Sequence, residues 1–294
     1  MSMTLLLQTL LDGLILGGVF SLSAVGFSLI FGVLGIVNLA HGIFVLLGAY
    51  LALALQAQAG LDPILSLPLV FIALFAVGAL LQKYLIAIAI QRGSLMTSLL
   101  VTFGLSLTLR DLVVLGFGPD IRTLQSALGL GTVRFGDIVV DGSRGTALIA
   151  SLVLLGLLSY VLYRTRVGRA IRATAQQRFA AGLCGIDAGR IFAVTFGVSA
   201  GFAGLSGVIV GMVNPFTPYD DAHWTLNAFV TVVLGGIGSP IGALVGGLLL
   251  GLISTLSSQY VGPVYPNIFI FCTLLLMLVV RPNGLLGNAF KGSI

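Results

Sequence analysis

The sequence predicts an all-α membrane protein, a polytopic bundle of about eight or nine spanning helices, on three observations. Charged residues make up 8% of the 294 residues, against about 25% in a soluble domain. Hydrophobic residues make up 58%, and the mean hydropathy is +1.15. The nine acidic residues are all Asp, so the Glu of solvated helix faces is missing. This composition excludes a soluble enzyme, a disordered chain and a nucleic-acid binder.

Long charge-free stretches locate the spans, and the whole chain, residues 1–294, is treated as one domain. A spanning helix needs about 20 residues, so 225–238 is expected to be tilted or re-entrant. The stretch 5–33 is long for one straight helix and is expected to be tilted or broken. The predicted spans lie near residues 5–33, 42–61, 64–82, 94–117, 145–163, 191–213, 225–238, 241–260 and 266–280.

The loops predict an orientation with the N-terminus outside and the C-terminus inside. Residues 164–190 hold six Arg and one Asp, a balance of +5 that equals the net charge of the whole chain. Short loops rich in Lys and Arg face the cytoplasm. Counting crossings from this segment places Asp220 and Asp221 outside and Arg281 inside. The protein is therefore expected to be a multi-pass membrane protein in contact with lipid.

Sequence patterns for catalysis or cofactor binding are missing. No G-x-x-x-x-G-K-[ST] stretch occurs, so the chain has no phosphate-binding loop of its own. His, Cys and Asp residues do not fall at metal-ligand spacing. The chain is expected to be no enzyme and to hold no cofactor or metal.

The basic segment 164–190 has the pattern of a docking helix. Residues 168–183 have helical composition, and Arg169, Arg172 and Gln176 would form one polar stripe along it. Gly185 is placed to end the helix in a left-handed conformation. A short helix with a small apolar face suits a groove on another protein.

Here the sequence resembles the branched-chain amino acid permease family of ABC importers. The run GRAIRATAQQRFAAGLCGID (168–187) resembles its coupling loop, and further similarity lies in 17–52, 232–251 and 281–287. Phe179 stands where the Glu-Ala-Ala-x-x-x-Gly motif has Glu, and Gln177 stands at an acidic neighbour position. The chain looks like the smaller of two homologous permease subunits.

The resemblance implies a heteromeric importer for branched-chain or other small, mainly apolar amino acids. Its partners would be a homologous second permease subunit, two ATPase subunits that bind the ATP, and a periplasmic substrate-binding protein. The residues expected to transmit movement from the ATPases are Arg169, Arg172, Ala180, Ala181, Gly185 and Ile186.

Four polar residues in the spans are candidates for the substrate pathway: Asn38, His41, Thr102 and Ser106. Asn38 and His41 are three apart, at the first break between spans. Two interpretations stay open for them. They line the pathway, or Asn38 caps a helix and His41 satisfies a buried carbonyl group. For Thr102 and Ser106, hydrogen bonding between helices competes with substrate contact.

A passive channel for urea or short amides is the alternative function. Its spans would also be rich in glycine and poor in charge. The basic segment separates the two classes, because a passive channel needs no docking surface for an ATPase.

Overall fold

The computed structural model describes residues 3–92, 95–128, 131, 133–135, 138–281 and 283–286. The helices and strands in this part of the chain are α1 (Met3–Leu34), α2 (His41–Ala59), α3 (Pro63–Leu81), a π-helix (Gln82–Ile86), α4 (Ala87–Arg92), α5 (Leu95–Phe117), β1 (Val133–Phe135), β2 (Ile138–Val140), α6 (Gly142–Arg164), α7 (Arg166–Gln176), α8 (Arg178–Leu183), α9 (Ala188–Val213), a 3-10 helix (Pro218–Asp220), α10 (Asp221–Gly235), α11 (Pro240–Tyr260) and α12 (Pro266–Val280). The predicted helical bundle is confirmed, with one addition, the short antiparallel pair β1–β2.

Side-chain caps and prolines fix where several helices begin. The Asp62 carboxylate accepts a hydrogen bond from the Ile64 amide at 2.9 Å, and Pro63 follows as the first residue of α3. Ser239 accepts in the same way from the Gly242 amide at 3.0 Å, before Pro240 of α11. Both pairs satisfy amide groups at a helix start that have no partner within the helix.

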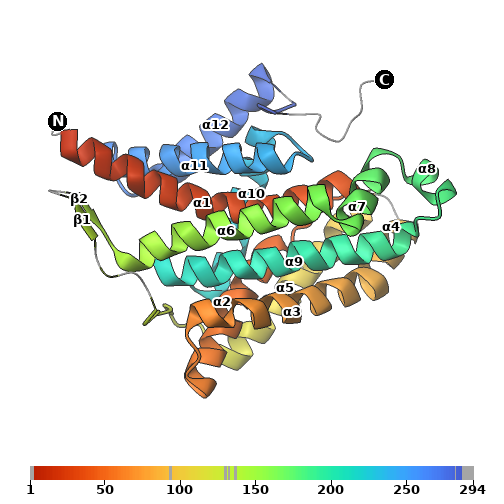
Figure 1. Cartoon of the computed structure of the whole chain (residues 1–294), viewed down its shortest axis with the longest axis horizontal. Coiled ribbons are helices and arrows are strands. Elements are labelled where there is room, and N and C mark those ends of the chain that lie inside the picture. The colour runs from red at the N-terminus through yellow and green to blue at the C-terminus, as the bar shows by residue number, and fades with distance from the viewer. Residues whose placement is uncertain are drawn as a thin grey trace.

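The centre of the bundle is formed by α1 and α9. Every residue from Gly17 to Ile30 of α1 is buried, as is every residue from Thr195 to Met212 of α9. Around this pair, α11 packs on α1, whereas α2 and α3 pack on α9. Figure 1 shows these helices running along one long axis, with α11 and α12 on one side and α2, α3 and α5 on the other.

Glycine permits the closest of these contacts. A Cβ atom on Gly207 of α9 would meet the Val45 carbonyl oxygen of α2, and one on Gly17 of α1 would meet the backbone of Leu248 in α11. Because backbone atoms cannot move aside as side chains do, these positions require glycine. The many glycines of the sequence therefore pack helices together.

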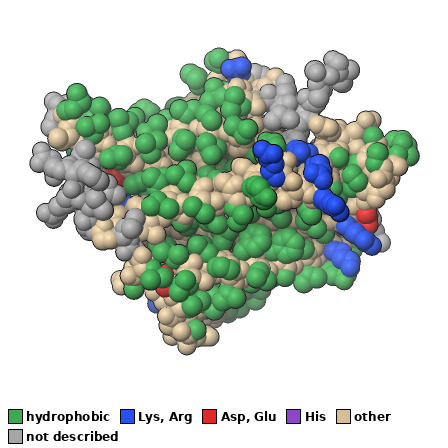
Figure 2. Space-filling model, in the orientation of Figure 1, with side chains coloured by type: hydrophobic (Ala, Val, Ile, Leu, Met, Phe, Trp, Pro, Cys, Tyr) green, Lys and Arg blue, Asp and Glu red, His purple; other side chains and the backbone are tan. Residues whose placement is uncertain are grey.

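Seven helices within the described residues are long and apolar enough to cross a membrane: α1, α2, α3 with its continuation to Ile90, α5, α6, α9 and α11. The helices α10 and α12 have 15 residues each. The 5–33 stretch, expected to be tilted or broken, forms one continuous 32-residue helix. Exposed Leu, Ile, Val and Phe side chains cover the outer faces of α3, α5, α6 and α12, as Figure 2 shows on one side of the molecule.

The two ends of the bundle differ. The N-terminal end of α1 and the β1–β2 pair lie at one end, and α4, α7 and α8 lie at the other (Figure 1). Lys and Arg side chains gather at the α7–α8 end (Figure 2). The Arg residues of the segment 164–190 therefore lie at one end of the helical bundle, which we call the basic end.

Candidate functional site

The helix α7 turns sharply away from the end of α6. Thr165 caps it by accepting a hydrogen bond from the Gly168 amide at 3.1 Å. A Cβ atom on Gly168 would meet the carbonyl oxygens of Val161 and Leu162. Ile171 and Thr174 are buried, so one face of α7 is held against the bundle.

The prediction of a single helix over 168–183 is wrong, because the helical conformation is interrupted at Gln177. This residue is extended, with φ −155° and ψ 104°, between α7 and α8. The break allows α7 to bury Ile171 and α8 to bury Ala181 on differently directed faces. The sequence pattern did not indicate this change of direction, since 168–183 contains no proline.

The predicted helix end at Gly185 is confirmed. Gly185 has φ +80°, in the left-handed region that favours glycine. The Ile186 amide donates to the Ala181 carbonyl oxygen at 3.1 Å, and the Cys184 amide donates to that of Ala180 at 3.2 Å. These bonds satisfy the last carbonyl groups of α8.

The six residues expected to transmit movement do not share one surface. Arg169, Ala180 and Gly185 are exposed, Ile186 is half-buried, and Ala181 is 5% exposed. Arg172 is turned inward. Its guanidinium donates to the Leu162 carbonyl oxygen and lies 5.1 Å from the centre of the Tyr163 ring. The expected stripe of Arg169, Arg172 and Gln176 is therefore interrupted, because Arg172 closes the end of α6.

The apolar face expected on this segment is present on α8, where two large side chains form it. Phe179 and Leu183 are each 76% exposed. They border a groove of about 480 Å³ that Gly182, Ile186 and Ala188 also line. Phe179 and Leu183 are four positions apart and therefore lie on one face of the helix. The sequence already contained a signal for this surface, because Phe179 stands where the family motif has Glu.

The four pathway candidates lie around one contact between α2, α5 and the chain before α2. The Asn38 side-chain oxygen accepts from the Ala40 amide at 3.1 Å, and His41 Nε2 donates to the Ser23 carbonyl oxygen at 3.0 Å. The Thr102 hydroxyl accepts from the Leu39 amide at 3.2 Å. All four candidates are buried, with exposed fractions of 4% or less.

Asn38 does not cap α2. The residue before that helix is Ala40, which makes no side-chain cap, and Asn38 instead bonds two residues ahead in the loop. The contact of His41 with a buried carbonyl group matches the second interpretation. Within the described residues, however, Asn38 Nδ2 and His41 Nδ1 are buried with no hydrogen-bond partner.

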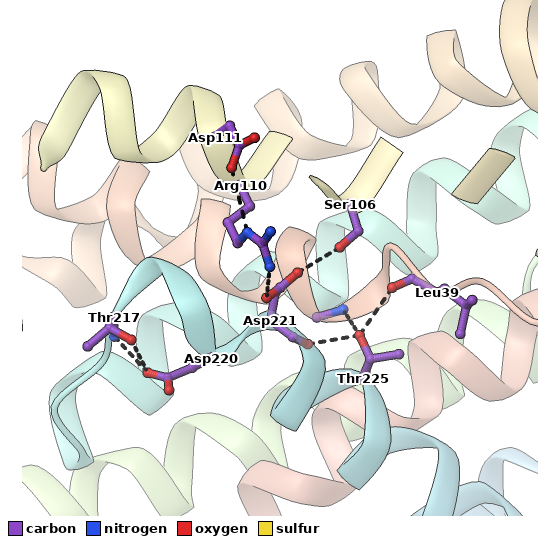
Figure 3. A network of polar contacts seen from close by, with 9 residues as sticks. Leu39, Ser106, Arg110, Asp111, Thr217, Asp220, Asp221 and Thr225 are labelled. Atoms are coloured by element: carbon purple, nitrogen blue, oxygen red, sulfur yellow. Dashed lines mark hydrogen bonds and ion pairs between the residues drawn. The ribbon is translucent and has the colours of Figure 1, made fainter. Parts of the chain in front are cut away.

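Asp221, which the loop charges assign to the extracytoplasmic side, is buried within the bundle beside the candidates at 4% exposure. Ser106 donates to its Oδ2 at 2.9 Å, and Arg110 Nη1 lies 3.7 Å from its Oδ1 (Figure 3). Gly42 explains the position. Its amide donates to Thr225 Oγ1 at 2.8 Å, and a Cβ atom there would meet the Asp221 carbonyl oxygen.

Together these residues form what we call the junction: Leu39, Gly42, Thr102, Ser106, Arg110, Asp221 and Thr225. It joins the starts of α2 and α10 to the middle of α5. Arg110 also lies 3.7 Å from the exposed Asp111 and 5.8 Å from the centre of the Tyr219 ring. No sequence pattern pairs Arg110 with Asp221, since the two are far apart in the chain.

Metal chemistry finds no support in the described part of the chain, where no cluster of three His, Cys, Asp or Glu side chains is suited to an ion. The arrangement offers interhelical polar contacts and one exposed basic end.

Comparison with known proteins gives a consistent result. Residues 9–280 match the family described as the permease component of branched-chain amino acid transport systems. The chain belongs to this family.

Its relatives include BraD of Pseudomonas aeruginosa, described as a high-affinity branched-chain amino acid transport system permease protein, at 33% identity over 96% of each chain. LivH of Escherichia coli, with the same description, is 31% identical over 96% of each chain. LivM of Salmonella typhimurium, also such a permease protein, is 26% identical over 91% of this chain and 68% of its own. No solved structure matches the chain.

The family resemblance seen in the sequence is thereby confirmed. The protein is a permease component of a transport system rather than an enzyme, and its seven membrane-length helices make it a multi-pass protein of the inner membrane.

Proposed function

We propose that this chain is one of two permease subunits of an ABC importer for branched-chain or other small, mainly apolar amino acids. The observation that carries the proposal is the match with BraD and LivH over 96% of each chain, because both are described as branched-chain amino acid permeases. A bundle with few charged groups also suits a substrate with an aliphatic side chain, which needs no buried ionic partner.

Separate ATPase subunits supply the energy in this proposal, and they dock at the basic end. The sequence has no phosphate-binding loop, so ATP is bound by those partners. Arg169, Ala180 and Gly185 are exposed for this contact, and Phe179 and Leu183 add an apolar surface. Ala181, Arg172 and Ile186 position the two short helices from beneath. Rigid-body movement of α7 and α8 would switch the pathway between its two openings.

The importer has a second, homologous permease subunit and a periplasmic binding protein. The similarity to both LivH and LivM of Salmonella typhimurium supports a pair of different but related permeases. The binding protein would approach the end of the bundle that carries the N-terminus and β1–β2, opposite the ATPases (Figure 1).

The proposed orientation is N-terminus outside and C-terminus inside, which requires an odd number of crossings, namely nine once α10 and α12 are added to the seven long helices. The basic end supports it, because positive segments stay in the cytoplasm. A reporter fused after Ile294 should be active in the cytoplasm. An extracytoplasmic reporter would contradict the orientation.

Asn38, His41, Thr102 and Ser106 are proposed to border the substrate pathway through the junction. Their support is the convergence of two helix starts in the middle of the bundle, and the partnerless Asn38 Nδ2 and His41 Nδ1 among the described residues. A moving α5 would expose these groups to a passing zwitterion.

The test is uptake of labelled leucine into vesicles that hold the chain, its second permease and the ATPases, with binding protein outside. Accumulation that requires ATP and the binding protein is expected. Equilibration of leucine or urea without ATP would contradict the proposal and favour the passive channel. Urea is the matched neutral probe, since it is small and uncharged.

A further inference from the structure

A cleft of about 500 Å³ opens at the basic end, between the π-helix after α3, α4 and the start of α9. Its lining includes Gln82, Lys83, Arg178, Asp187, Arg190 and Phe192. The segments that meet here come from separate parts of the chain, so folding brings the cations together.

The charge of the cleft is positive. Lys83, Arg178 and Arg190 face one carboxylate, that of Asp187. Asp187 is already engaged, since it accepts from the amides of Gly189 and Arg190 and lies 3.1 Å from the Arg190 guanidinium. The Arg178 guanidinium stacks 4.8 Å from the centre of the Phe192 ring, which leaves its edge free to donate hydrogen bonds.

Gln82 adds a polar group at the inner wall of the cleft. Its side chain is 1% exposed, and among the described residues its Oε1 has no hydrogen-bond partner. A buried amide oxygen without a partner costs free energy. Because Oε1 accepts hydrogen bonds, it suits a donor such as a head-group hydroxyl or a tightly held water molecule.

The depth of the cleft points to the kind of ligand. Lys83 follows the first residue of α3, Pro63, by twenty positions, which is about 30 Å along a helix. That length equals the thickness of a bilayer's hydrocarbon core, about 30 Å. Lys83 therefore lies at the level of lipid phosphate groups.

An exposed apolar surface lies beside the cleft. Tyr84, Leu85 and Ile88 are 62%, 40% and 46% exposed. Tyr is frequent at this level of a membrane, with its ring among the tails and its hydroxyl in the head groups. A lipid in contact with these side chains can place its phosphate in the cleft.

We propose that this cleft binds the phosphate group of an anionic phospholipid. Lys83, Arg178 and Arg190 contact the phosphate oxygens, and Gln82 contacts the head group from below. Arg178 is the first residue of α8 and Arg190 lies in the first turn of α9, so the bound lipid ties α8 to the end of α3. The inference rests on the membrane position of α3 and does not depend on the transported substrate or on the ATPases.

The experiment is native mass spectrometry of the full chain released from detergent, with phosphatidylglycerol or phosphatidylcholine of equal acyl chains. The wild-type chain should retain phosphatidylglycerol, the anionic lipid, in preference to phosphatidylcholine. Each of Lys83→Gln, Arg178→Gln and Arg190→Gln should lower that preference about fivefold, from the attraction typical of one cation near lipid head groups. Equal retention of the two lipids by the wild-type chain would overturn the proposal without any variant.

The matched control is the triple change of Arg164, Arg166 and Arg169 to Gln, which removes three cations from the basic end but none from the cleft lining. It should keep the preference. A loss as large as that of the cleft variants would overturn the site, because charge alone would then explain binding.

Soluble glycerol phosphate distinguishes the source of the phosphate. It should compete weakly, since it lacks the acyl chains that contact Tyr84 and Leu85. Displacement of phosphatidylglycerol by equimolar glycerol phosphate would overturn the lipid assignment and indicate a free phosphate site. Loss of the lipid when the chain assembles with its partner subunits would assign the cleft to an acidic protein surface instead.

Discussion

The junction and the basic end are two polar regions of a mainly apolar molecule, and they differ in how far their charged groups are exposed to solvent. Asp221 in the junction is 4% exposed and contacts both Ser106 and Arg110. The Arg190–Asp187 pair of the basic end is 87% and 57% exposed. Polar groups inside the bundle therefore hold helices to one another, whereas those at the end are available to partners.

The largest effect is expected from the close glycine contacts between helices. In Gly207→Leu, the new side chain would meet the Val45 carbonyl oxygen of α2. Overpacking costs about 1–3 kcal/mol in ordinary cores, and rigid backbone on both sides should raise that cost. The variant is expected to lose its folded, monodisperse form in detergent, measured by size-exclusion chromatography.

Gly104→Leu is its control, because a Cβ atom on Gly104 of α5 has open space among the described atoms. This variant should elute as the wild-type chain does. Equal behaviour of the two variants would contradict the role given to close glycine contacts.

The next effect concerns the basic end. Gly185→Asp places a side chain where φ is +80°, with a strain of about 1 kcal/mol and a new charge at the end of α8. The chain should insert normally, while substrate-stimulated ATPase activity of the assembled importer falls at least about tenfold. Gly182→Asp places the same charge on the exposed face of α8 without backbone strain, and therefore separates the effect of the charge from the effect of the strain. Unchanged activity of Gly185→Asp would contradict the coupling role of this helix end.

A moderate effect is expected from the buried carboxylate of the junction. Asp221→Ala leaves Ser106 without its hydrogen-bond acceptor and Arg110 without its buried ion-pair partner, at a cost of about 2 kcal/mol. The unfolding temperature should fall by on the order of 5 °C. Asp111→Ala is the matched control, since Asp111 lies at the same 3.7 Å from Arg110 but is 71% exposed. Similar shifts for both variants would mean that burial does not set the strength of this contact.

The smallest effect is expected for Asp62, the residue before α3, whose carboxylate accepts hydrogen bonds without being deeply buried. Its burial raises the pKa, but hydrogen bonds from the amides of Ile64, Leu128 and Ala127 and from the Ser126 hydroxyl outweigh this, so the pKa of Asp62 is lowered. A lowered pKa stabilises the folded chain above the ordinary value near 3.8, and this contribution is lost as the pH falls below it.

The protection factors of the amides at 127 and 128, which correct for intrinsic exchange, should therefore fall below about pH 4. In Asp62→Asn these protection factors should already be low at pH 6. Protection factors that are independent of pH in the wild-type chain would show that the carboxylate does not hold this loop.

Much of the fold follows from composition, because charge-free runs of membrane length leave little choice of element. The basic end was predictable for the same reason, since six Arg in one segment stand out in a chain with few charges. Gly185 was also predictable, because a helix end in the left-handed region has a strong residue preference.

Other features depend on contacts between distant residues. Asp221 follows a polar stretch and resembles an outer loop residue, and only the packing of Gly42 against α10 buries it. The break at Gln177 follows from α7 and α8 each burying a different face. The inward turn of Arg172 depends on the free carbonyl group of Leu162 at the end of α6. No local pattern encodes these three outcomes.

The central claim is that α8 is the surface on which an ATPase docks. A photo-crosslinking residue at position 179, where the side chain is 76% exposed, tests it in the assembled importer, with position 264, 81% exposed between α11 and α12, as the control. A crosslink from 179 to the ATPase subunit and none from 264 are expected. A crosslink from 264 to the ATPase, or none from 179, would contradict this claim.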